Sequence, residues 1–294
     1  MTGTKNHSFI KYEESVMLDI KEIRIRDPFI FTDKKNSCYY MYGTTALENG
    51  SIRARTTFSV YKTYDLKSFE APVVAFDGEA CGFWADRDFW APELHEYKGK
   101  FYLFGSCKSA DRCRATQIFV SDSPMGPFSP LSDKPVTPED WECLDGTLWV
   151  ENGIPYIVFC HEWLQVKNGE ICALRLSEDL THSLGEPTVL FKATDEPAVT
   201  AINKPDSGNY VTDGPFLFTE NGRLKMIWSS FCRGRYMVLE AESDSLLGKW
   251  EHHGSRFPFD GGHAMLFHRL DGKRMISLHS PNTAGLERAV FFEY

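Results

Sequence analysis

A short hairpin pattern recurs five times along the chain and limits the folds that the chain can adopt. In each copy a polar residue stands near glycine or proline, and a short apolar strand follows. The chain then turns at a polar pair and closes the unit with a second β-rich strand. Asn-Gly and Asp-Gly pairs between alternating apolar runs are the strongest short-range signals of a β-hairpin. The five polar pairs are Lys35-Asn36, Lys98-Gly99, Asn152-Gly153, Asn221-Gly222 and Asp271-Gly272.

The copies recur at intervals typical of a blade repeat. Their opening residues lie 66, 52, 68 and 50 positions apart and are Asp27, Glu93, Asp145, Asp213 and His263. After four of the hairpins a second pair of β-rich segments follows, as in residues 58–72 and 236–253. About five units of about four strands predict an all-β fold, a five-bladed β-propeller with four-stranded antiparallel blades around a central channel. We expect one domain over residues 1–294, with residues 8–18 as a strand that closes the short last blade.

Composition and charge agree with this prediction and exclude several classes of protein. With 42% hydrophobic and 14% aromatic residues, a chain of 294 residues can fill one large all-β core. No apolar run approaches the roughly 18 residues of a membrane span, and the N-terminus has no secretory signal, so we expect a cytoplasmic protein without a membrane partner. The eight cysteines show no zinc spacing. A net charge of −9 without a basic stripe argues against nucleic acid as a partner. The sequence does not predict an oligomeric state.

The geometry of a propeller predicts where the opening residues meet. The first strand of each blade lies nearest the axis, so the five strand starts should surround one mouth of the channel. Carboxylates that crowd one mouth raise each other's pKa and weaken folding, so a function explains them better than stability does. We expect Pro28 to hold Asp27 in the extended region of the backbone. By strand alternation, Arg26 should point to the opposite face of the strand.

Four motifs give the chain a specific resemblance. They are "RDPFIF" at 26–31, "WAPELHEYKGKFYLFGS" at 90–106, the Asp-Gly segment at 145–150 and "TDGPFLF" at 212–218. With these motifs at blade spacing, the chain resembles the family-43 glycoside hydrolases from about Arg26 to the C-terminus. The resemblance implies a five-bladed propeller enzyme that removes arabinofuranosyl or xylosyl units with inversion of configuration.

The resemblance also implies roles for individual residues. Asp27 matches the general base that activates water, Asp145 matches an auxiliary aspartate that raises the pKa of the acid, and Asp213 matches the general acid. His263 matches a channel histidine that holds a calcium ion (Ca2+) through water in part of the family, and Arg288 matches a late arginine near Asp145. No organic cofactor is implied. In an inverting enzyme the acid and the base stand roughly 6.5–9.5 Å apart, which leaves room for the attacking water.

The sequence departs from the family pattern at Asp213, where the family more often carries glutamate. The aspartate is one methylene shorter, so its carboxyl falls short of the usual place. Three outcomes follow: the backbone approaches more closely and Asp213 is still the acid, or Glu162 or Glu93 protonates the leaving group, or the site only binds sugar. The first outcome is favoured because the rest of the motif is intact.

Further residues near the mouth are candidates for substrate contact. Trp90 and Trp163 are expected to stack on a sugar ring, and Glu93 and Glu162 are expected to bind substrate hydroxyls. Each has a structural alternative: Glu93 can join blades by accepting backbone N–H bonds, and His263 can be a buried histidine with satisfied hydrogen bonds. A single aspartate before proline or glycine, taken alone, is usually a turn residue.

Three functions compete at this point. The first is an exo-acting hydrolase of short arabinose- or xylose-containing oligosaccharides. The second is a retaining hydrolase of the sucrose- and fructan-acting propellers, whose carboxyls stand only ~5 Å apart. The third is a propeller that binds carbohydrate without catalysis. A WD-repeat scaffold is excluded, because its repeats run about 40–45 residues with a Trp-Asp ending.

Overall fold

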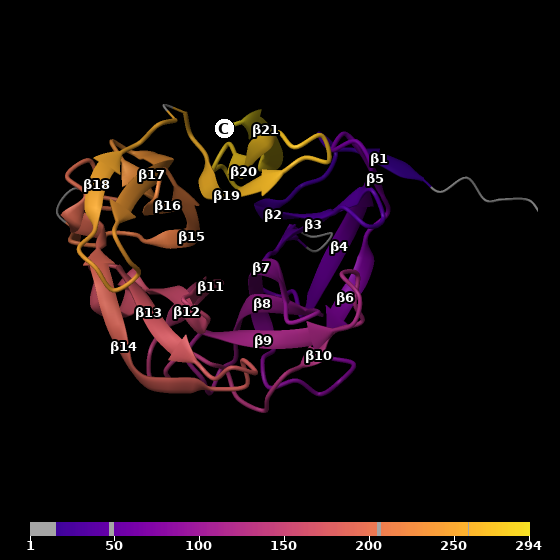
Figure 1. Cartoon of the computed structure of the whole chain (residues 1–294), viewed down its shortest axis with the longest axis horizontal. Helices are drawn as coiled ribbons and strands as arrows, with labels where there is room; N and C mark the ends of the chain where they lie inside the picture. The colour runs from indigo at the N-terminus through magenta and orange to yellow at the C-terminus, as the bar shows by residue number, and fades with distance from the viewer. Residues whose placement is uncertain (1–15, 47–49, 205–206, 258) are drawn as a thin grey trace, which may run out of the picture.

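Five antiparallel sheets stand in a ring in the computed structural model, which describes residues 16–46, 50–204, 207–257 and 259–294 (Figure 1). The first strand of each hairpin lies toward the centre of the ring, and the later strands lie further out. This arrangement confirms the predicted five-bladed β-propeller. The five inner strands are β2, β7, β11, β15 and β19.

The blades differ in their number of strands. The second, third and fourth have the four strands that were predicted, whereas the first blade has six strands and the fifth has three among the described residues. Blade one contains β1 (Met17–Asp19), β2 (Arg26–Asp33), β3 (Cys38–Thr44), β4 (Thr57–Thr63), β5 (Ser68–Glu70) and β6 (Val73–Asp77). Blade two contains β7 (Arg87–Tyr97), β8 (Lys100–Lys108), β9 (Ala115–Ser121) and β10 (Ser129–Pro130).

The remaining blades follow in chain order. Blade three contains β11 (Cys143–Glu151), β12 (Ile154–His161), β13 (Glu170–Leu176) and β14 (Ser183–Lys192). Blade four contains β15 (Asp213–Glu220), β16 (Arg223–Cys232), β17 (Arg235–Ser243) and β18 (Glu251–Gly254). Blade five contains β19 (Gly262–His268), β20 (Arg274–Ser280) and β21 (Arg288–Glu293). Two short helices, α1 (Trp163–Val166) and η1 (Ala193–Asp195), follow β12 and β14. In the part of the chain that the structure describes, no helix is long and apolar enough to cross a membrane.

The polar pairs form the predicted turns in three blades. Lys98-Gly99, Asn152-Gly153 and Asn221-Gly222 each have positive φ at both residues, as a two-residue type I′ turn requires. The other two hairpins have longer loops, residues 34–37 and 269–273. These turns join the inner strands to their partners at the strand ends opposite Asp27, Asp145 and Asp213, and they set the register of each hairpin.

The ring closes differently from the prediction. Residues 16–18 of the expected closing segment lie beside blade one, where β1 pairs with β5, and residues 8–15 lie outside the described residues. The closing contact is instead a bridge between Arg24 and Arg288, reinforced by the Ile25 N–H, which donates to the Glu287 carbonyl at 3.4 Å. The chain therefore joins the first blade to the last immediately before β2, the strand that carries Asp27.

Aromatic side chains fill the space between neighbouring blades. Phe58 of β4 lies 5.1 Å from Phe89 and 5.7 Å from Phe119 of blade two, measured between ring centroids. Phe191 of blade three lies 5.4 Å from Trp228 of blade four in the same way. Burial of one large apolar side chain stabilises the fold by roughly 1.5–3 kcal/mol, so these contacts hold the blades at fixed positions around the mouth.

Candidate active site

A β-bulge near the start of each inner strand shapes the mouth of the channel. The register of each inner strand shifts by one residue against its partner at this point. A bulge bends the strand and re-aims the side chain that it carries. The bulged residue has positive φ in all five blades: Asp27 (53°), Ala91 (43°), Asp145 (57°), Gly214 (52°) and His263 (52°).

Two expectations about Asp27 are wrong because of this bulge. Its backbone is left-handed and not extended, although Pro28 follows it. The bulge also interrupts strand alternation, so Arg26 and Asp27 both line the mouth instead of facing opposite sides. Arg26 is thereby an arginine of the site, which the alternation rule had excluded.

The bulges also correct the alignment of the five copies. Asp213 stands one residue before the bulge of its blade, and Glu93 stands two residues after the bulge of its own. A proline follows the bulged residue in three blades, as Pro28, Pro92 and Pro215. If the copies are aligned on these prolines instead of on the polar residues, Ala91 and Gly214 stand at the positions equivalent to Asp27.

A pocket of about 350 Å³ lies at the mouth and receives side chains from all five blades. Its volume is within the range of small-molecule sites. Seven of the nine predicted site residues line it: Asp27, Trp90, Asp145, Glu162, Trp163, Asp213 and His263. Among the other lining residues, the two arginines Arg26 and Arg53 and the phenol of Tyr236 were not predicted from the sequence.

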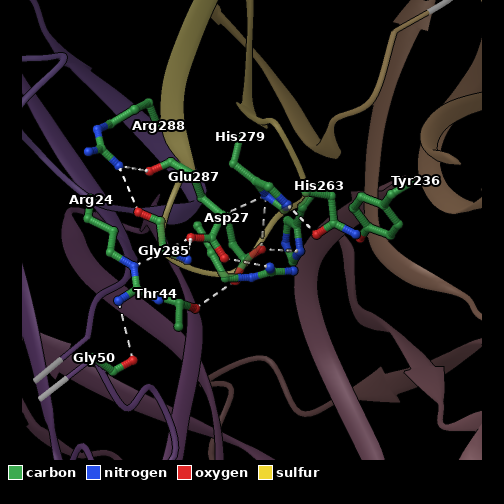
Figure 2. A network of polar contacts seen from close by, with 12 residues as sticks. Arg24, Asp27, Thr44, Gly50, Tyr236, His263, His279, Gly285, Glu287 and Arg288 are labelled. Atoms are coloured by element: carbon green, nitrogen blue, oxygen red, sulfur yellow. Dashed lines mark hydrogen bonds and ion pairs between the residues drawn. The ribbon is translucent and has the colours of Figure 1, made fainter.

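Asp27 is held as a carboxylate at the centre of a polar network (Figure 2). The Thr44 hydroxyl donates to Oδ2 at 2.6 Å, and Nδ1 of His263 lies 3.2 Å from Oδ1. The backbone N–H of Asp27 donates to Nδ1 of His279 at 3.2 Å. Burial by itself would raise the pKa of Asp27, but the charge and the hydrogen bond of His263, together with the charge of Arg26, outweigh it and hold this pKa well below its usual range.

His263 carries the positive charge that balances these carboxylates. Its Nδ1 lies 3.2 Å from Asp27 and 3.7 Å from Asp145. Burial would lower the pKa of His263, but the charges of Asp27 and Asp145 overcome it and raise the pKa to about 10. The imidazole is therefore protonated near neutral pH and pairs with the Asp27 carboxylate.

The residues present do not offer calcium a directly coordinated site. Calcium takes six to eight oxygen ligands, whereas the described part of the chain contains no group of three or more His, Cys, Asp or Glu side chains that could hold a metal. A protonated His263 also repels a cation. We derive no step through calcium, and an ion held through water at His263 stays a prediction.

Asp145 and Asp213 are two further carboxyls of the pocket, and the pKa of each is raised. The Gly214 N–H donates to Oδ2 of Asp145 at 3.0 Å, and the Tyr236 hydroxyl donates to Oδ2 of Asp213 at 2.9 Å. Burial raises the pKa of Asp145 to about 8, with further contributions from the charges of Asp213 and Asp27. Burial also raises the pKa of Asp213. Asp27 is thus ionised while a neighbouring carboxyl keeps its proton near neutral pH.

Glu162 belongs to a buried ion network that the sequence did not reveal. Arg114 is 2% exposed and donates to Oε2 of Glu162 and, at 2.8 Å, to Oδ2 of Asp88. Its guanidinium lies 4.3 Å from the ring centroid of Trp90, and the Trp90 Nε1–H donates to the Ile52 carbonyl at 3.1 Å. A stacked arginine therefore covers part of the indole that was expected to stack on a sugar.

Arg114 and Tyr236 could have been found from strand direction. The third strand of a blade runs antiparallel to the second, so it begins at the mouth. Arg114 directly precedes β9, and Tyr236 is the second residue of β17. Only the starts of first strands and the ends of second strands had been expected to reach the mouth.

Two residues that were predicted to contact the substrate, Arg288 and Glu93, lie outside the pocket lining. Arg288 is not among the residues that line the pocket; its Nε–H donates to the Lys21 carbonyl at 2.6 Å, and Figure 2 shows the side chain directed at backbone carbonyls rather than at Asp27. Arg26 lines the pocket and pairs with Glu287 at 3.1 Å. Glu93 is 4% exposed, lies outside the pocket lining and pairs with His95 at 3.1 Å, so the structural alternative describes it better.

A methyl group at Gly214 should damage the site beyond its effect on the backbone. A Cβ there would lie 2.8 Å from the His263 ring, and φ is +52°. We expect Gly214→Ala to lower activity at least tenfold, because it displaces both the imidazole and the N–H that binds Asp145. Gly222→Ala is the matched control, since φ is +76° and no atom lies within 4 Å.

The two glycine variants should differ in activity measurements. The shared backbone strain costs roughly 1 kcal/mol of unfolding free energy in each variant. Thermal denaturation measures this common cost, and kcat/KM measures the difference between the variants. Equal activities for the two would show that contact with His263 is unimportant.

Comparison with known protein families and solved structures identifies relatives of this chain. The model of the glycosyl hydrolases family 43 matches residues 20–293. An endo-arabinase from Bacteroides thetaiotaomicron has a structure with a TM-score of 0.87 and 41% sequence identity, covering 96% of this chain and 98% of that one. A thermostable family-43 glycoside hydrolase, at 24% identity and a TM-score of 0.77, covers 92% of this chain and 89% of its own, and shares the fold.

Two curated enzymes are also similar over part of their length. Alpha-L-arabinofuranosidase 43 of Humicola insolens is 27% identical over 172 residues, which are 54% of this chain and 33% of that protein. An extracellular exo-alpha-(1->5)-L-arabinofuranosidase of Streptomyces avermitilis is 24% identical over 213 residues, 69% of this chain and 40% of that protein. The chain thus matches between a third and two fifths of the length of these relatives. Because the family match extends over nearly all of the sequence, the chain belongs to glycosyl hydrolase family 43.

Proposed function

We propose that the protein hydrolyses arabinofuranosyl linkages in short oligosaccharides with inversion of configuration. The observation that carries the proposal is one pocket in which Asp27 is ionised while neighbouring carboxyls have raised pKa values. Inversion needs this combination of a base and an acid. Arabinose is favoured over xylose because the 41% identical structure is an endo-arabinase and both curated relatives are arabinofuranosidases.

The proposed reaction assigns one task to each group. Asp27 takes a proton from water, and the water oxygen bonds to the anomeric carbon as the glycosidic C–O bond breaks. A protonated carboxyl of the pocket gives its proton to the leaving oxygen. His263 and Thr44 hold the Asp27 carboxylate in position, and the charge of Asp27 favours the protonated form of Asp145 and Asp213.

We propose exo action, with a chain end in the pocket. All five blades contribute to the lining, so the pocket favours the end of a chain over a chain that passes through. The second candidate is endo action, which the similarity to an endo-arabinase favours. Analysis of the products of an arabino-oligosaccharide ladder separates the two, because an exo enzyme releases arabinose from the first turnover.

A panel of nitrophenyl glycosides tests the reaction itself. We expect turnover of the α-L-arabinofuranoside, and ¹H NMR should detect β-arabinofuranose as the first product. A first product of unchanged configuration, with turnover of a β-D-fructofuranoside, would support a retaining enzyme instead. Tight oligosaccharide binding without turnover would support a binding protein. The same assay after dialysis against EDTA tests the predicted calcium ion, which, like the cytoplasmic location, stays a prediction.

A further inference from the structure

We propose that Glu162, and not Asp213, donates the proton to the leaving group in the proposed hydrolysis. The inference rests on that function and assigns one of its two central roles to a residue of blade three. Glu162 stands at the end of β12, immediately before α1, and Asp213 begins β15 in the next blade. Both side chains line the pocket, so the two candidates are distinguished by side-chain length and by the hydrogen bonds of their carboxyl oxygens.

The two carboxyls differ in how their oxygens are used. Arg114 binds Oε2 of Glu162. Oε1 accepts no hydrogen bond from the described residues, and it is not one of the fully buried polar atoms that lack a partner. Oε1 is therefore open to the pocket, in an orientation that Arg114 fixes. Asp213 has the shorter side chain, and the Tyr236 hydroxyl donates to its Oδ2. A hydroxyl that donates to a carboxylate stabilises its ionised form.

The charges around Glu162 also favour a protonated carboxyl at neutral pH. Burial and the charges of Asp213 and Glu142, opposed by those of Arg114 and Lys108, raise its pKa to about 7. The other titratable or charged groups that line the pocket are Arg26, Asp27, Arg53, Asp145, Tyr236 and His263. A negative charge on Asp213 raises the pKa of both Glu162 and Asp145, so an ionised Asp213 favours the protonated form of Glu162.

The step balances with no further reactant. Water loses a proton to Asp27 and forms the new bond to the anomeric carbon. The electrons of the broken C–O bond stay on the leaving oxygen, which takes the proton of Glu162. Asp27 ends protonated and Glu162 ionised, and exchange with solvent restores both.

Leaving-group dependence tests the assignment. We expect Glu162→Gln to lower kcat/KM for arabinotriose by ~10²–10⁴-fold, but for 4-nitrophenyl α-L-arabinofuranoside by less than about tenfold, because nitrophenolate leaves without protonation. Asp213→Asn should lower both values by a similar factor. Glu162→Asp should recover part of the arabinotriose activity. Glu139→Gln, at an exposed glutamate that pairs with Lys134, is the control.

The pH profile is an independent measurement. A required acid with a pKa of about 7 makes kcat/KM of the wild type for arabinotriose fall above pH 7. Glu162→Gln should remove this fall, and Asp213→Asn should shift it to lower pH by removing a charge that favours the protonated acid.

The outcomes separate this inference from the proposed function. A wild type inactive on all arabinosides overturns the proposed function and the inference with it. An active wild type whose leaving-group dependence and alkaline fall change in Asp213→Asn, and not in Glu162→Gln, overturns the inference alone. Circular dichroism of each variant verifies that it is folded.

Discussion

Asp27→Asn is expected to lower kcat/KM for an arabinofuranoside by ~10²–10⁴-fold, the range that a positioned general base contributes. Asparagine has nearly the same shape but cannot take a proton from water. The loss should be similar for nitrophenyl and oligosaccharide substrates, because activation of the water does not depend on the leaving group. This pattern distinguishes the base variant from the acid variant.

The Asp27→Asn chain should still fold, although it loses one side of a buried ion pair. His263 keeps Asp145 as a second partner at 3.7 Å, and removal of one carboxylate relieves repulsion within the cluster. Asp271→Asn, in an exposed turn of blade five, is the control and should keep wild-type activity. Steady-state kinetics and thermal denaturation are measured for both, and near-normal turnover by Asp27→Asn would disprove its role.

The sequence was sufficient to predict the ring of blades because the relevant signals are local. The Asn152-Gly153 and Asn221-Gly222 turns depend on two residues that tolerate positive φ, whatever surrounds them. Convergence of Asp27, Asp145 and Asp213 follows from strand direction once the ring is assumed. Neither inference required knowledge of contacts between blades.

The details of the pocket depend on contacts that a linear pattern does not contain. The bulges place Arg26 in the lining of the pocket and leave Glu93 outside it. Strand alternation cannot predict a bulge. Arg288 was expected near the pocket by resemblance, but it binds the Lys21 carbonyl of the segment that enters blade one. Prolines after the bulges were the one local signal that could have corrected the alignment.

The ion network around Arg114 shows why a sequence pattern does not reveal buried charged residues. Arg114 lies 26 residues from Asp88 and 48 from Glu162 in the sequence, and each comes from a different strand end. Arginine in a charged loop such as residues 111–114 is ordinarily solvated. Arg114 is buried where Asp88 of blade two and Glu162 of blade three pair with it.

Arg114→Met is expected to cost more stability than substitution of any one carboxylate of the pocket. Methionine fills much of the same volume but leaves the Asp88 carboxylate, which is 2% exposed, with only its 3.5 Å pair to the exposed Arg53, and it removes the guanidinium that orients Glu162. Removing one partner of a buried ion pair costs roughly 3–5 kcal/mol, which corresponds to a melting temperature lower by roughly 6–20 °C. Thermal denaturation at neutral pH measures this loss.

A neighbouring arginine provides the control for Arg114. The Arg112 guanidinium lies 5.5 Å from the Trp84 ring centroid, and Arg112→Met should change the melting temperature little, because this side chain is exposed. The double variant Asp88→Asn/Arg114→Met should recover part of the lost stability, since asparagine needs no counter-charge. Loss of Arg114 also removes a charge that lowers the pKa of Glu162, so the alkaline fall in kcat/KM should move to higher pH. A variant with wild-type stability and an unchanged pH profile would show that Arg114 neither supports the fold nor positions the proposed acid.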